Sequence, residues 1–424
     1  MTSRERVAAA ISHQEPDRVP LDLGGCATTG MQVDTVYRLR QTLKLDPPRT
    51  PVKVTEPYQM LGEIKPDLMA ALGIDVVGLG KPSTMFGFKN QGWKPWQTFE
   101  GTPVLVPEGF NTEPDENGDI LMYPEGDRSV PPSGRMPKGG FYFDSTRRQP
   151  PFQEDQLNVE DNLEEFGAIS DEDLECFRRE AERLFTQTDK ALLANFGGTA
   201  FGDIALVPAP WLKHPKGIRD VEEWYVSTAT RRNYVYKIFE RQCEIALKNL
   251  ERIYQAVGDR VTAVFTTGTD FGAQNGPFIS PQAYRELFKP FNKQVNDWIH
   301  KSTPWKSFIH SCGSVRMLIP DFIEAGFDIL NPVQCSAAGM VPAELKREYG
   351  KDLTFWGGGV DTQRTLPFGT PDEVRKEVRE RLKTFGTGGG YVFNTTHNVQ
   401  ARVPVENVLA MYDTLRESGR YPLQ

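Results

Sequence analysis

The chain alternates short apolar runs with longer amphipathic segments. Eight runs have the length of a strand, and most of them end in Gly, Thr or Asn. They read "VPLDLGG" (19–25), "IDVVGLG" (74–80), "ALLANFGG" (191–198), "RVTAVFTTGTD" (260–270), "SFIHSCG" (307–313), "FDILNPVQC" (327–335), "LTFWGGGVD" (353–361) and "GYVFNTTHN" (390–398). Runs that are apolar almost throughout are typical of parallel strands covered on both faces.

Helical patterns separate these runs. In "SPQAYRELFKPF", Ser280 is the expected N-cap, and in "TPDEVRKEVRERLKTFG" Thr370 and Glu373 form a predicted capping box. Eight strands alternating with helices predict a (β/α)8 TIM barrel of the α/β class. An open doubly wound sheet is the main alternative, but we find no glycine-rich dinucleotide turn.

Residues 81–190 interrupt this alternation. The segment is rich in Gly, Pro, Asp and aromatic residues, and "ENGD" (116–119) and "PEGD" (124–127) read as turns between short antiparallel strands. We therefore expect one domain over residues 1–424, with 81–190 as a β-rich insertion after the second strand. A lid over the active site is one interpretation, and a peripheral decoration or dimer contact is the other.

Composition narrows the class of function. The chain has 424 residues and a formal net charge of −8, which disfavours a nucleic-acid partner because phosphate binding needs a basic surface. No stretch approaches the length of a membrane span, and no signal peptide is recognisable. The five cysteines, an odd and scattered set, fit a reduced cytoplasmic protein; they are residues 26, 176, 243, 312 and 335.

Candidate chemistry gathers at the predicted strand ends, which build the active site of a barrel. These ends carry Asp22 and Cys26, Asp270, His310 with Cys312, Gln334 with Cys335, Asp361, and Asn394 with His397. In "FIHSCG" the His and the Cys are two positions apart and so share one face of a strand. A third N or S donor would complete a catalytic zinc site with an open position, and His397 and Cys335 compete for that place.

These residues also carry a family resemblance. "GPFISPQAYRELFKPF", "IHSCGSV", "GGGVDTQRTLPFGTPDEV" and "GGYVFNTTHNVQARVPVENVLAMYD" resemble the uroporphyrinogen decarboxylase superfamily, specifically its cobalamin-dependent methyltransferase branch. That branch binds zinc through H-x-C and a distant Cys in an "N-P-G-C-G" type stretch. His310 and Cys312 match the first part, whereas "NTTHN" places His397 where the Cys would stand.

This departure bears on the reaction. Zinc held by one thiolate and two neutral imidazoles keeps a net positive charge, which two thiolates would neutralise, and is the better Lewis acid toward an oxygen. The resemblance therefore implies an O-demethylase type of methyltransferase, a conclusion that weakens if Cys335 is the ligand. The decarboxylase branch fits poorly, because "LDLGGCATTG" lacks the Arg residues, and "VVGLGKPST" the Asp, with which that branch binds a polyanionic porphyrinogen.

The expected activity is zinc-dependent transfer of a methyl group from a small-molecule donor, an aryl methyl ether (a methoxylated aromatic), to the cobalt(I) of a corrinoid. The chain lacks a D-x-H-x-x-G stretch, so the corrinoid (cobalamin) would arrive on a separate protein. Asp270, Asp361 and Asn394 are the candidate catalytic residues; either aspartate orients substrate or a metal ligand, or simply caps a loop. Alternatives are methylcobamide-to-thiol or -folate transfer, decarboxylation of another substrate, and non-enzymatic metal or tetrapyrrole binding. A homodimer is a further expectation, since dimers are common in the superfamily.

Overall fold

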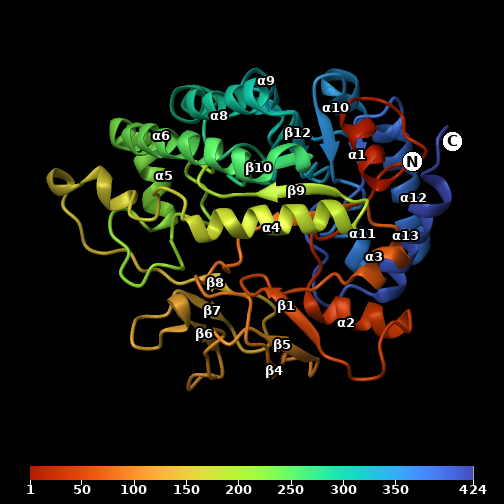
Figure 1. Ribbon diagram of the computed structural model, residues 1–424, viewed down its shortest axis with the longest axis horizontal. Helices are drawn as coiled ribbons and strands as arrows, with labels where there is room; N and C mark the ends of the chain where they lie inside the picture. Colours follow the sequence, from red (N-terminus) through yellow and green to blue (C-terminus); the bar gives the residue numbers. More distant parts are fainter. Residues whose placement is uncertain (424) are drawn as a thin grey trace.

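The structure is a computed structural model, and it describes residues 1–423. Its centre is a parallel sheet of seven strands that adjoin one another in sequence order (Figure 1). Seven of the eight predicted runs supply them: β3 (Val76–Gly80), β9 (Ala191–Asn195), β10 (Ala263–Thr267), β11 (Lys306–His310), β12 (Ile329–Asn331), β13 (Thr354–Trp356) and β14 (Tyr391–Val392). This confirms the α/β class and the parallel arrangement of the strands.

The eighth run connects the two edges of this sheet. Leu21 pairs in parallel with Phe393, next to β14, and its carbonyl accepts a hydrogen bond from the N–H of Asp75, the residue before β3. The sheet is therefore curled, so that its first and last strands are both hydrogen-bonded to the segment around Leu21.

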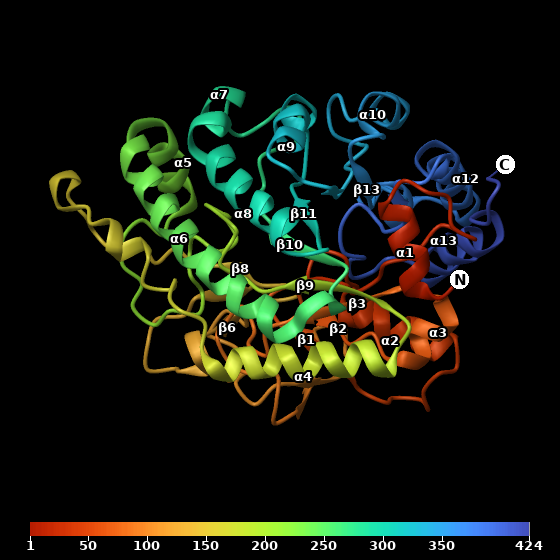
Figure 2. The ribbon, with the colours of Figure 1, turned by 45° about the horizontal axis from the view of Figure 1, so that its top comes forward.

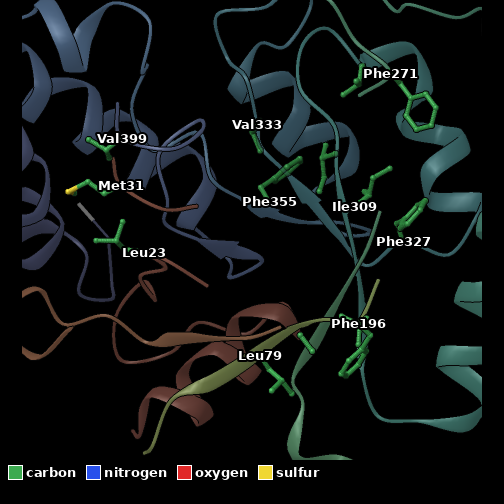
Figure 3. Close-up of a cluster of buried hydrophobic side chains, with 14 of the residues drawn as sticks. Leu23, Met31, Leu79, Phe196, Phe271, Ile309, Phe327, Val333, Phe355 and Val399 are labelled. Atoms are coloured by element: carbon green, nitrogen blue, oxygen red, sulfur yellow. The ribbon is translucent and has the colours of Figure 1, made fainter. Parts of the chain in front are cut away.

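Apolar side chains of alternate strand positions fill the inside of the curl. They share one cluster with three residues of helix α1 (Ser3–Ile11), which packs against β3, β9 and β14. The strand members are Val76, Ala191, Leu193, Ala263, Phe308, Ile329, Trp356 and Val392. Neighbouring positions such as Ile309 and Phe355 belong to a second, larger cluster, which Figure 3 shows in part. This alternation is what a strand covered on both faces requires.

Helices cover the outer face of the sheet (Figure 2). Helix α4 packs against β3 and β9, and α8 packs against β11. The expected N-caps at Ser280 and Thr370 are confirmed, and the latter completes its capping box with Glu373. The helices are α2 (Val33–Thr42), α3 (Pro66–Leu72), α4 (Asp171–Gln187), α5 (Val221–Thr230), α6 (Arg232–Val257), α7 (Pro281–Ala283), α8 (Lys289–Ser302), α9 (Ile319–Glu324), α10 (Pro342–Tyr349), α11 (Thr365–Phe368), α12 (Pro371–Arg381) and α13 (Val405–Ser418).

Shorter helical turns join these elements. Two are π-helical and continue α7 and α12, respectively: η5 (Tyr284–Phe288) and η7 (Leu382–Gly386). The 3-10 turns are η1 (Pro124–Gly126), η2 (Glu154–Gln156), η3 (Val159–Asn162), η4 (Gly258–Arg260) and η6 (Arg316–Leu318). Among residues 1–423, no helix combines the length and apolar character that crossing a bilayer would require.

Two small sheets lie below the parallel sheet in the view of Figure 1. One has the order β2-β1-β5-β4 and the other the order β6-β7-β8. The antiparallel pairs expected within 81–190 are present, but the first sheet also uses two strands that precede β3 and that the sequence did not reveal. The strands are β1 (Val52–Glu56), β2 (Leu61–Gly62), β4 (Lys94–Gln97), β5 (Pro103–Val106), β6 (Ile120–Met122), β7 (Gly134–Met136) and β8 (Asp144–Ser145).

Candidate metal centre

His310 and Cys312 lie together at the carboxyl end of β11. His310 is the last residue of the strand and is 3 % exposed, and Cys312 follows in a half-buried turn. The Sγ of Cys312 lies 3.4 Å from Nε2 of His310. The turn continues through Gly313 at φ +83°, where a Cβ would lie 2.3 Å from the carbonyl oxygen of Gly272. A glycine is thus needed where this turn packs against the backbone of Gly272.

His397 reaches the same place from the loop after β14. Its ring centroid lies 5.5 Å from that of His310, and the two rings are inclined by 75°. One ligand atom each from His310, Cys312 and His397 lies within 4.8 Å of the other two. Three donors that are up to 87 positions apart in the sequence therefore meet at the ends of two strands.

Cys335, the other candidate for the third ligand, lies outside this group of three. Its Sγ is 3.3 Å from the carbonyl oxygen of Val333 and 4.0 Å from that of Gly358. The structure thus favours His397 over Cys335. Asp361 also points elsewhere, because its carboxylate accepts hydrogen bonds from the backbone N–H groups of Gln363 and Arg364 and so caps its own loop.

Asp270 stands beside the three donors. Its Oδ1 accepts a hydrogen bond from the backbone N–H of Cys312 at 2.7 Å and lies 3.9 Å from Nε2 of His310. Burial raises the pKa of Asp270, although the hydrogen bond from Cys312 opposes the shift. Among residues 1–423 no Lys or Arg forms an ion pair with it, so this carboxylate adds negative charge beside the thiol.

Asn394 supports the loop that carries His397. Its side-chain amide donates to the carbonyl oxygen of Asp22 at 2.9 Å, while its Oδ1 is buried without a hydrogen-bond partner in the described structure. The contact joins the last strand to the first predicted run, and a free buried oxygen remains for a polar ligand.

Sequence reasoning missed two asparagines that hold the histidines. Oδ1 of Asn331, at the end of β12, lies 2.6 Å from Nδ1 of His310. Asn398 donates its backbone N–H to Nδ1 of His397 at 2.8 Å, and its side chain bonds to two other segments, at Ala27 and Gly30 and at Gln59. Both asparagines are 0 % exposed. The available signal at position 331 was a polar residue that ends the apolar run in "FDILNPVQC".

Electrostatics keep the three donors neutral without a metal. Burial lowers the pKa of His310 to about 4, against the opposing hydrogen bond to Asn331. Burial and the neighbouring His310 lower the pKa of His397 to about 4 as well. Burial and the nearby charge of Asp270 raise the pKa of the Cys312 thiol. Near neutral pH, neutral imidazoles are ready to bind a metal, whereas the thiol releases its proton on metal binding.

The donor set fits a divalent metal of borderline softness. Two imidazole nitrogens and one thiolate are ligands typical of zinc, and three protein ligands leave the fourth tetrahedral position open, as in catalytic zinc sites. The half-buried setting of Cys312 and His397 gives an external ligand access to that position.

Comparison with known proteins shows what part of the chain is similar to. Residues 214–418 match the sequence profile described as uroporphyrinogen decarboxylase (URO-D). The chain is 26 % identical over 181 residues to the uroporphyrinogen decarboxylase of Neisseria meningitidis serogroup C, covering 40 % of this chain and 49 % of that protein. It is 23 % identical over 216 residues to that of Pseudoalteromonas translucida, covering 47 % and 58 %. The chain thus spans about half the length of these curated relatives.

A solved structure extends the likeness over almost the whole chain. A methyltransferase from Methanosarcina mazei superposes with a TM-score of 0.54 over 98 % of this chain and 99 % of that one, at 14 % sequence identity. At that identity the match bears on the fold alone. The likeness in sequence to uroporphyrinogen decarboxylases therefore covers residues 214–418, and the structural match shows a shared fold over almost the whole chain.

Proposed function

We propose that this protein is a metal-dependent methyltransferase that removes a methyl group from an ether oxygen and passes it to a corrinoid on a separate protein. The observation that carries the proposal is the meeting of His310, Cys312 and His397 at the carboxyl ends of the strands. The fold likeness to a methyltransferase supports it. We also propose that residues 19–23 act as the remaining strand of a (β/α)8 barrel whose mouth holds this group.

The donor set favours an oxygen leaving group. Zinc held by the Cys312 thiolate and the neutral imidazoles of His310 and His397 would keep positive charge and would supply Lewis acidity toward the ether oxygen. In the proposed transfer the C–O bond would break with its electron pair left on oxygen, and the methyl carbon would be passed to the corrinoid, whose cobalt(I) would supply the electron pair of the new bond. Stabilising the charge that develops on the leaving oxygen is where such a site gains rate.

Residues around the group orient it. Asp270 fixes the turn of Cys312 through the backbone hydrogen bond, and Asn394 ties the loop of His397 to Asp22. At the ends of β3 and β9 the sheet bears glycines: a Cβ at Gly80 or Gly198 would meet no atom within 4 Å. We propose that the methyl donor, a methoxylated aromatic, enters on this open side.

Decarboxylation is the second candidate, because the curated relatives are uroporphyrinogen decarboxylases. The profile match begins at residue 214, and the stretches "LDLGGCATTG" (21–30) and "VVGLGKPST" (76–84), which lie before it, carry no Arg to bind a polyanionic substrate. A carboxylated substrate with fewer charges would be required.

Metal analysis combined with a methyl-transfer assay tests the proposal. Protein purified without added metal should contain about one zinc per chain and should methylate a reduced corrinoid protein when methoxybenzene is supplied. Cys312→Ser should lose both properties, and Cys176→Ser, on helix α4 away from the group, should keep both. Methylation by metal-free protein would contradict the proposal. Removal of methyl from a pre-methylated corrinoid by a thiol or folate alone would show that the donor assignment is wrong.

A further inference from the structure

The two histidines of the group are held by opposite hydrogen bonds. At His310 the partner of Nδ1 is the side-chain oxygen of Asn331, because the amide nitrogen of Asn331 donates to the carbonyl oxygen of Trp356 at 2.7 Å. An oxygen can only accept, so Nδ1 of His310 carries the ring proton. The lone pair of a neutral ring then lies on Nε2, the atom 3.4 Å from the Cys312 sulfur.

At His397 the partner of Nδ1 is a donor. The backbone N–H of Asn398 points at Nδ1 over 2.8 Å, and a backbone N–H can only donate. Nδ1 of His397 therefore holds the lone pair, and Nε2 carries the ring proton. The rest of Asn398 is fixed by bonds to Gly30, Ala27 and Gln59, so this N–H is not free to turn away.

From this contrast we infer that the two histidines are unequal ligands: His310 is preset to bind a metal, and His397 is the weak, labile one. Binding through Nε2 of His397 moves the ring proton to Nδ1, where it opposes the Asn398 N–H. Binding through Nδ1 replaces that hydrogen bond outright. Either route gives up an interaction that His310 keeps, because Asn331 accepts the Nδ1 proton in both the metal-free and the metal-bound state.

The inference rests on the proposed metal site and deepens it by assigning Asn331 as a positioning residue. A labile third ligand could dissociate from the metal when the ether oxygen binds, while His310 and Cys312 keep the metal in place. In the resembling branch a Cys stands where His397 lies here, and a thiolate has no second ring nitrogen to be held by a backbone donor.

Zinc affinity, measured by competition with a chelator, tests the grading without reference to activity. His310→Ala should weaken zinc binding on the order of a hundredfold, whereas His397→Ala should weaken it only about tenfold, since removing His397 also removes the need to break its hydrogen bond. His397→Cys should bind zinc more tightly than the wild type. His300→Ala, an exposed histidine on α8, is the matched control and should leave the affinity unchanged.

Substitutions at Asn331 test the origin of the grading. Asn331→Asp keeps an acceptor for the Nδ1 proton and should hold zinc as tightly as the wild type. Asn331→Leu should lose 10- to 100-fold, roughly what removal of a metal ligand's hydrogen-bond partner does elsewhere. Asn296→Leu removes an equally buried asparagine beside β11 and should lower the unfolding free energy without changing zinc affinity.

The outcomes separate this inference from the proposed function. Equal losses for His310→Ala and His397→Ala, or wild-type affinity in Asn331→Leu, would overturn the grading even if methyl transfer is found. If the variants show the expected zinc affinities but the protein transfers no methyl group, the difference between the two histidines stands and the proposed function is contradicted. Failure of the wild type to bind zinc would overturn both.

Discussion

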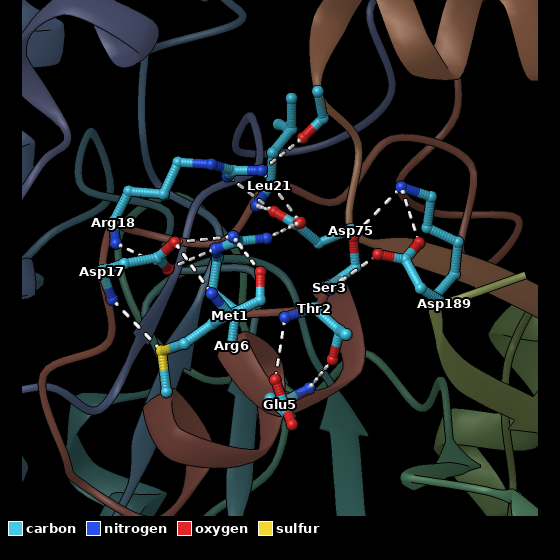
Figure 4. Close-up of polar contacts among 12 residues, drawn as sticks. Met1, Thr2, Ser3, Glu5, Arg6, Asp17, Arg18, Leu21, Asp75 and Asp189 are labelled. Carbon is cyan, nitrogen blue, oxygen red and sulfur yellow. Dashed lines mark hydrogen bonds and ion pairs between the residues drawn. The ribbon is translucent and has the colours of Figure 1, made fainter.

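The two ends of the parallel sheet differ in whether their buried carboxylates form ion pairs with Lys or Arg. At the amino end, Asp75 precedes β3 and is fully buried, and its carboxylate accepts hydrogen bonds from Arg6 and Arg18 at 2.7–2.9 Å (Figure 4). At the carboxyl end, neither Asp203 nor Asp270 forms an ion pair with a Lys or Arg of residues 1–423. Arginines of the chain neutralise the buried carboxylate at the amino end, whereas no Lys or Arg among residues 1–423 neutralises those at the carboxyl end.

This difference suggests that the amino end of the sheet contributes to stability and the carboxyl end to the chemistry of the site. Arg6 comes from α1 and Arg18 from the segment before Leu21. Their ion pairs with Asp75 therefore bind the amino-terminal part of the chain to the amino end of the sheet. At the upper end, Asp270 touches the candidate metal ligands. A divalent metal at the carboxyl end would supply the positive charge that Arg6 and Arg18 supply at the amino end. The carboxyl ends of barrel strands commonly carry the active site, and the amino ends stabilise.

Removing the ion pairs of Asp75 at the amino end of the sheet should have the largest effect on stability. Asp75→Asn leaves two arginines without their shared buried carboxylate and should lower the free energy of unfolding by about 3–5 kcal/mol in urea titrations. Asp17→Asn, which removes a half-exposed partner of Arg6, should change it by about 1 kcal/mol or less. Zinc affinity should be the same in both variants. Equal losses in the two variants would contradict the assignment of Asp75 as the buried anchor.

Asp203 should make stability fall as pH rises. Burial, with a contribution from Asp270, raises its pKa to about 7. The native state keeps this proton up to about pH 7, but the unfolded chain releases it near pH 4, so stability is lost across that interval, by about 2–4 kcal/mol. Asp203→Asn should flatten this part of the unfolding profile, and Asp155→Asn, at an exposed position, should not. An unchanged slope in Asp203→Asn would show that this carboxyl ionises freely in the native state.

Metal should stabilise the unpaired end. A ligand that binds the folded state alone, at one hundred times its dissociation constant, adds about 2.7 kcal/mol to the free energy of unfolding. We expect zinc at that excess to stabilise the wild type by this amount and Cys312→Ser hardly at all, as measured by thermal or urea unfolding with and without a chelator. Equal stabilisation of both proteins would place the zinc elsewhere.

The smallest effect is expected at Cys335. Its sulfur faces backbone carbonyl oxygens and lies outside the group of three, so Cys335→Ser should change zinc affinity less than threefold and stability by about 1 kcal/mol or less. A large loss of zinc in this variant would restore Cys335 as the third ligand and remove His397 from that role.

Local pattern predicted much of this arrangement. Continuous apolar runs with polar ends identified the strands of the parallel sheet, because burial on both faces leaves few polar residues except where a strand ends. The same reasoning brought His310, Cys312 and His397 to one rim. The short β1 and β2 were missed, since "VKVTE" (52–56) and "LG" (61–62) pair with each other and with β5 through contacts that no local pattern records.

Three-dimensional detail decided the rest. Whether Cys335 or His397 reaches the group depends on the direction of each turn, which a run of residues does not encode. Asn331 sits in an apolar strand, and its role follows from which of its amide atoms faces Trp356 and which faces His310. Asp361 satisfied the pattern for a strand-end acid, but its carboxylate caps its own loop.

X-ray absorption at the zinc edge is the sharpest test of the group formed by His310, Cys312 and His397, because it counts the atoms around the metal. We expect one sulfur at about 2.3 Å and two imidazole nitrogens at about 2.0–2.1 Å, with an oxygen or nitrogen atom in the remaining position. Two sulfurs, or a shell of oxygens alone, would contradict this expectation.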